Sequence, residues 1–93
     1  MPADLEEKTE RYEQLLTEAL EQAEVAPPDG SPLAAVAEEY AEMARSYLAD
    51  GRHFRAEGDP VNALASFAYG HGWLDAGARA GLFSVPAGAG FTI

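Results

Sequence analysis

The sequence predicts an all-α fold, an up-and-down bundle of three helices. Apolar residues recur at helical spacing in three long segments, and short turns rich in proline and glycine separate these segments. No stretch alternates apolar and polar residues over the length of a strand. Ninety-three residues suffice for one hydrophobic core and not for two. We therefore expect a single three-helix domain over residues 1–83 and an apolar C-terminal tail over residues 84–93.

The first helix is expected over residues 4–25. Asp4 can cap its N-terminus, with Glu7 placed three positions later as in a capping box. Leucine, tyrosine and alanine recur along one face, and the opposite face is rich in glutamate. The turn at residues 26–30 contains two prolines and a glycine, so the helix must end before it.

The second helix is expected over residues 32–57. Ser31 and Pro32 supply an N-cap and a first-turn proline, and Gly58 supplies a terminator. The apolar stripe passes through Gly51, which predicts one long helix in which this glycine lets a neighbouring helix approach closely. The stripe expected to be buried contains Leu33, Val36, Tyr40, Met43, Ala44, Tyr47, Gly51 and Phe54.

The third helix, expected over residues 60–80, is apolar on both sides. Asp59, Pro60 and Gly81 supply its cap, its first residue and its terminator. The side expected to meet the other helices carries Leu64, Phe67, Ala68, His71, Leu74 and Ala78. The opposite side is the predicted interface and carries Ala65, Tyr69, Gly72, Trp73, Ala76 and Ala80. A three-helix bundle covers only one side of such a helix, so either a second copy or the tail, through Val85, Phe91 and Ile93, must cover the other.

The charge of the chain is strongly negative. Sixteen acidic residues stand against six basic ones, for a formal net charge of −10, and Lys8 is the single lysine. This balance argues against binding to nucleic acid or to an anionic membrane surface. An acidic surface poor in lysine is typical of a protein that works in concentrated salt, although an ordinary acidic protein fits as well. The absence of cysteine, of a secretory signal and of a long apolar segment predicts a soluble cytoplasmic protein.

Four polar residues form a candidate cluster on the second and third helices. If these helices are antiparallel, Tyr47 and Asp50 return roughly to the level of residues 68–71, so the four polar groups, with His71 and Asp75, can converge. We favour a buried hydrogen-bond network that fixes the helix register, and a metal or small-ligand site is the alternative. No nucleophilic triad and no phosphate-binding glycine loop is present, so we expect neither catalysis nor a cofactor.

Several runs of residues resemble an archaeal family of small helical-bundle proteins catalogued as domain of unknown function 357. The runs are residues 47–54, the segment from Gly58 to Leu64, and residues 69–77 followed by Gly81, Leu82 and Phe83. The resemblance covers about residues 40–83, implies an archaeal and, with the acidic composition, a haloarchaeal source, and supplies no activity. Small and aromatic residues across the second and third helices are also similar to a tetratricopeptide helix pair, at Gly51, Phe54, Gly58, Asp59, Ala63 and Phe67.

Two functions remain open from the sequence. The favoured one is a non-catalytic module for protein–protein interaction or assembly, acting as a homodimer or as a small subunit of a larger complex. The alternative is a small-ligand or metal-binding protein that uses the polar cluster around His71.

If the acidic surface is an adaptation to salt, stability must depend on salt. Added ions screen the repulsion among the carboxylates, so we expect the melting temperature to rise steeply between low and molar potassium chloride. Thermal unfolding followed by circular dichroism tests this expectation, and a melting temperature that stays constant over this range contradicts it.

Overall fold

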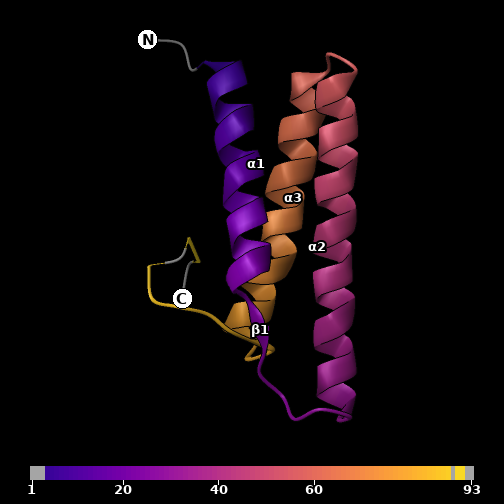
Figure 1. The fold of residues 1–93 in the computed structure, drawn as a ribbon, viewed down its shortest axis with the longest axis vertical. Coiled ribbons are helices and arrows are strands. Elements are labelled where there is room, and N and C mark those ends of the chain that lie inside the picture. The colour runs from indigo at the N-terminus through magenta and orange to yellow at the C-terminus, as the bar shows by residue number, and fades with distance from the viewer. Residues whose placement is uncertain (1–3, 89, 92–93) are drawn as a thin grey trace.

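Three long helices run down, up and down again in the view of Figure 1, which shows the computed structural model; the structure describes residues 4–88 and 90–91. Helix α1 spans Leu5–Gln22, α2 spans Pro32–Ala56 and α3 spans Pro60–Arg79. Helix α2 is antiparallel to both of its neighbours. The all-α three-helix bundle is therefore confirmed, and α2 and α3 form its closely packed pair.

The helices begin and end where their capping residues lie. Each N-cap side chain accepts a hydrogen bond from the backbone N–H three residues later, Asp4 from Glu7, Ser31 from Ala34 and Asp59 from Asn62. Gly58 and Gly81 follow α2 and α3 with φ of 77° and 80°. This left-handed conformation costs a glycine little and stops each helix at the expected place.

The end of α1 differs from the expectation. The helix stops three residues before residue 25, and Glu24–Val25 forms a short strand, β1, that pairs antiparallel with β2, Phe83–Ser84. Two residues are too few for an alternating pattern to be visible in the sequence. Because β2 spans the expected domain boundary at residues 83 and 84, it ties the start of the tail to the end of α1.

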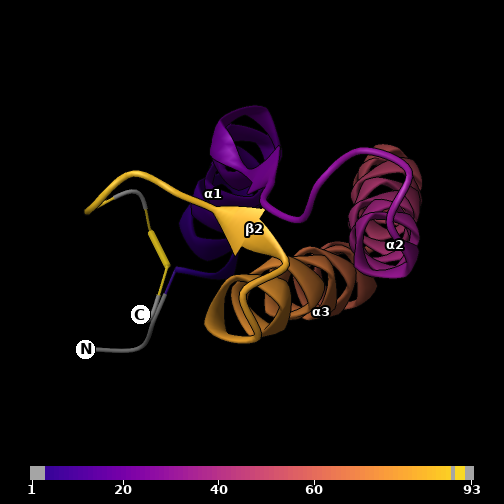
Figure 2. The ribbon, with the colours of Figure 1, turned by 90° about the horizontal axis from the view of Figure 1, so that it is seen from below.

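The core lies where α3 packs against both other helices (Figure 2). Leu16 from α1 and Phe67 and Leu74 from α3 are fully buried. Leu82 and Phe83, just beyond α3, are 5% exposed and join the same core. Helix α3 is therefore the central element of the bundle.

The buried face of α2 is not the stripe expected from the sequence. It consists of small residues and one leucine, namely Ala34, Ala37, Ala41, Ala44, Leu48 and Gly51. Leu33 and Val36 from the expected stripe are 59% and 36% exposed. Small side chains let α2 approach its neighbours closely, and most of the larger side chains therefore lie along the edge of the contact.

The buried face of α3 is likewise rotated from the expected one. Phe67, Leu74 and Ala78 are buried as expected, whereas Ala68 is exposed and His71 is only half-buried. Small residues complete the buried face, namely Ala63, Ser66, Gly70 and Gly77. The observed buried face is therefore shifted from the predicted one by about one position along the sequence. The small residues, which permit the closest packing, lie on the side that is turned inward.

Two glycines mark the close approach of α2 and α3. A Cβ atom added to Gly51 would overlap the ring of Phe67, which is fully buried. A Cβ atom added to Gly70 would lie 2.9 Å from Tyr47 Cβ and 2.9 Å from Leu16 Cδ2. The expectation that Gly51 permits a close helix contact is confirmed.

The two helical glycines Gly51 and Gly72 predict opposite effects of the same substitution. Gly51→Ala should lower the free energy of unfolding by about 1–3 kcal/mol, because the new methyl group would overlap the fully buried ring of Phe67 and force it or the helices to shift. Gly72→Ala should raise it by up to about 1 kcal/mol, because no atom lies within 4 Å of the new methyl group and alanine favours a helix. Urea denaturation of dilute protein measures both changes, and a stabilising Gly51→Ala would contradict this account of the α2–α3 contact.

Candidate functional site

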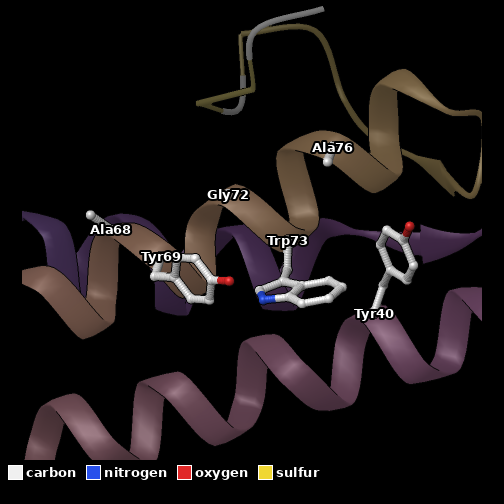
Figure 3. Close-up of a pocket in the computed structure, with 6 residues that line it drawn as sticks. All are labelled: Tyr40, Ala68, Tyr69, Gly72, Trp73 and Ala76. Carbon is white, nitrogen blue, oxygen red and sulfur yellow. The ribbon is translucent and has the colours of Figure 1, made fainter.

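The most prominent surface feature is a row of aromatic side chains where α2 meets α3 (Figure 3). Tyr40 comes from α2, and Tyr69 and Trp73 come from successive turns of α3. The rings of Tyr40 and Trp73 are 5.1 Å apart between centroids, with an interplanar angle of 89°. Tyr69 lies 6.4 Å from Trp73 at 86°, so both tyrosines meet the indole in edge-to-face geometry.

Two adjacent hollows lie beside this row. The first has a volume of about 320 Å³ and is lined by Tyr40, Ala68, Tyr69, Gly72, Trp73 and Ala76. The second, of about 550 Å³, is lined by Glu39, Tyr40, Glu42, Met43 and Trp73. Because both hollows share Tyr40 and Trp73, they form one aromatic surface along the α2–α3 edge, which we call the aromatic edge.

The residues of the predicted interface lie next to one another on this surface. Five of the six are exposed, and Trp73 is half-buried between the two tyrosines. Tyr69 is 57% exposed, and its inner edge packs on Tyr47 with ring centroids 4.7 Å apart. We call the exposed set, Ala65, Tyr69, Gly72, Ala76 and Ala80, the α3 outer face. Whether it forms an interface stays a prediction.

The described part of the tail lies elsewhere. Figures 1 and 2 both place it beyond α1, on the side away from α2. Val85 and Phe91 pack against the core, and the ring of Phe91 lies 6.0 Å from that of His71. The idea that Phe91 folds over Trp73 is therefore wrong for this residue, and Ile93 lies outside the described residues. The aromatic edge is left open to solvent while the opposite side of α3 is covered.

The four residues of the predicted polar cluster lie on two sides of α3. Tyr47 packs on Tyr69 at the aromatic edge, and Asp50 is exposed on α2. His71 lies on the side covered by the tail, and Asp75 is half-buried one turn further along α3. The four side chains therefore do not converge on one point.

His71 is half-buried beside the ring of Phe91. Its Nε2 atom is buried and has no hydrogen-bond partner, which differs from the satisfied network that we expected. Within the described residues, no group of three or more histidine, aspartate or glutamate side chains is placed to hold a metal ion. A metal site at His71 would thus lack its other ligands in this part of the chain.

A second charged cluster, which the sequence reasoning missed, joins α1 to α2. Arg55 Nη1 donates to Glu13 Oε1 at 2.8 Å, and Arg52 Nε donates to Glu13 Oε2 at 3.0 Å. Arg55 also reaches Glu6 at 3.3 Å. The signal was present in the spacing, since Glu6 and Glu13 lie seven apart on α1 and the two arginines three apart on α2, so each pair shares one helix face.

This cluster changes the pKa of its central carboxyl group. Partial burial alone would raise the pKa of Glu13, but the hydrogen bonds and positive charges of Arg55 and Arg52 outweigh burial and lower it. Glu13 in turn raises the pKa of Arg55. Each charged side chain of the cluster is paired with an opposite charge on the other helix. We therefore interpret the cluster as a structural clamp between α1 and α2.

The fold and this surface together define a small all-helical bundle that carries an open aromatic edge. Within its described residues, no helix is long and apolar enough to cross a membrane.

The chain belongs to the family described as "Protein of unknown function (DUF357)", whose model matches residues 11–83. This match confirms the family resemblance and extends it into α1. Searches of curated proteins and of solved structures found no match.

The Glu13 clamp predicts a pH-dependent loss of stability. Because the folded state lowers the pKa of Glu13, its contribution is present at neutral pH and is lost as the pH falls through the folded-state pKa. Glu13→Gln should therefore lower the free energy of unfolding by about 1 kcal/mol or less at pH 7. The difference from the unchanged protein should shrink below about pH 4.

Urea denaturation at several pH values measures this difference. Glu21→Gln, an exposed change of the same charge on α1, serves as the matched control. If Glu13→Gln lowers the free energy of unfolding by the same amount at pH 7 and at pH 3, the carboxylate charge is not what stabilises the contact.

Proposed function

We propose that the protein is a non-catalytic module for protein–protein interaction, and that it associates with a second copy of itself through the α3 outer face and the adjoining Trp73. The observation that carries the proposal is that this surface is apolar and exposed, while the described tail residues lie on the other side of α3. Contiguous exposed apolar surface on a small protein commonly marks an interaction site.

The distribution of charge supports a second copy as the partner. The chain carries a net charge of −10, and α3 holds Asp75 and Arg79 as its only acidic and basic residues. Two copies that meet through α3 keep their acidic α1 helices away from the contact. A contact through α1, which carries six glutamates, would bring carboxylates of both copies together, which opposes association.

The shape of the α3 outer face also supports a twofold-symmetric contact between two copies. Tyr69 projects from it, and one turn away a Cβ atom at Gly72 would meet no atom within 4 Å. In a twofold interface the same surface meets itself, so the tyrosine of each copy can fill the hollow beside the glycine of the other. Small residues at Ala65 and Ala76 permit the two helices to cross closely.

Two other proposals from the sequence stand on weaker support. A larger complex that contains this chain as a small subunit would use the same aromatic edge. A small-ligand or metal site at His71 is supported by its unpartnered Nε2 atom, but Phe91 already packs beside that imidazole.

The amino-acid composition supports a proposal about the organism and the cell compartment in which this protein works. We propose an archaeal, salt-adapted and cytoplasmic protein that does not bind nucleic acid. Sixteen acidic residues, a single lysine and no cysteine support this proposal.

Gly72→Glu tests the proposed self-association. The new side chain has space in a single copy, so the bundle should stay folded, but it places bulk and charge at the centre of the contact. We expect the dimer to weaken by about tenfold or more, because a buried unpaired charge is costly. Sedimentation velocity over a range of protein concentrations in high salt measures the dissociation constant.

The matched control is Ala49→Glu, which adds the same charge at an exposed position of α2 away from the α3 outer face. It should leave the dimer intact, and so should removal of residues 85–93. If the unchanged protein is a monomer at high micromolar concentration in high salt, the proposed self-association is wrong.

A further inference from the structure

We propose that the hollow between Trp73 and α2 is a binding site for a small organic cation, in particular a quaternary or alkylated ammonium group. This is the hollow of about 550 Å³ lined by Glu39, Tyr40, Glu42, Met43 and Trp73. The proposal goes beyond self-association and does not rest on it. Four of the five lining residues come from α2, and Trp73 is the one residue that the hollow shares with the proposed dimer contact.

The aromatic walls of the hollow have the geometry that favours a cation. The rings of Tyr40 and Trp73 both line the hollow and stand at 89° to each other, so it has two aromatic walls set nearly at a right angle. The face of an aromatic ring carries negative potential, and tryptophan gives the strongest cation–π attraction of the side chains. Met43 completes the wall with a polarisable thioether.

Two carboxylates lie at the rim of the same hollow. Glu42 is paired with Arg45 at 3.3 Å, but both side chains are more than half exposed, at 69% and 52%. Such a pair contributes little and can open to accept another cation. Within the described part of the chain, Glu39 forms no ion pair, so its charge is available at the rim.

The chemistry of the lining distinguishes an organic cation from other ligands. An anion would meet two carboxylates in a chain of net charge −10. A hard metal ion requires several oxygen ligands, and the described residues contain no such group. A methylated ammonium group carries a diffuse charge and an apolar surface, which match aromatic walls with an acidic rim. The volume of the hollow lies in the range of small-molecule sites.

Trp73 makes the test direct because it is the only tryptophan of the chain. The fluorescence of dilute protein is titrated with choline and, separately, with 3,3-dimethyl-1-butanol, which has the same shape without the charge. Sodium chloride holds the ionic strength constant. We expect a saturable change with choline and a roughly two- to fivefold weaker affinity for the alcohol.

A pair of double variants tests the role of the rim. Glu39→Gln with Glu42→Gln should weaken choline binding by roughly two- to fivefold and leave the affinity for the alcohol unchanged. Glu18→Gln with Glu21→Gln removes the same charge from α1 and should have less than about half of this effect at high ionic strength.

The proposal is overturned by any of three results. These are equal affinity for choline and the alcohol, a fluorescence change that sodium chloride alone reproduces, and equal weakening by both double variants. Sedimentation velocity on the same samples reports the oligomeric state separately. Choline binding by a protein that stays monomeric at high micromolar concentration would thus contradict only the proposed self-association. A protein that forms a dimer at high concentration but does not bind choline as a dilute monomer would contradict only the cation site.

Discussion

The close contact between α2 and α3 is the constraint on which the rest of the structure depends. Gly51 lies against the buried ring of Phe67, and Gly70 lies against Tyr47 and Leu16. A side chain at either glycine would push the helices apart. With small residues in the contact, α3 can touch α1 and α2 at once and act as the central helix of a bundle that holds only a few large core residues.

The aromatic edge is a consequence of this contact. Because alanine and glycine occupy the space between the helices, Tyr40 and Trp73 lie at its edge and meet there at 5.1 Å. Edge-to-face packing holds each ring in place while one side remains open to solvent. A rigid, half-exposed tryptophan is therefore what the packing of small residues produces, and it supplies a preformed surface for binding.

The starts of all three helices and the ends of α2 and α3 could be predicted from the sequence, whereas the end of α1 and the rotation of the helices could not. Asp4, Ser31 and Asp59 act through local hydrogen bonds, so their effect is legible in a few neighbouring residues. The rotation of α2 depends on which face packs most closely, which is a property of two helices together. The helical periodicity of large apolar residues predicts that Leu33 and Val36 are buried. Close packing of α2 against its neighbours instead buries the face that carries the alanines. The pairing of β1 with β2 joins residues about sixty positions apart, Glu24 with Ser84 and Val25 with Phe83. The contacts of Glu13 with Arg52 and Arg55 also join distant residues, 39 and 42 positions apart.

The position of the tail gives the two sides of α3 different roles. Gly90 has a φ of 85°, and a Cβ atom there would lie 2.7 Å from Leu15 Cδ1, so the tail backbone passes close to α1. Phe91 then covers His71, and the apolar side of α3 that faces α1 is satisfied within the chain. The described tail residues lie beyond α1, on the side away from α2, whereas Trp73 packs on Tyr40 of α2. Helix α3 has two apolar sides, and the described tail residues cover the one that carries His71. The other side stays exposed within this chain, and it is the surface through which we propose that the protein associates with a second copy.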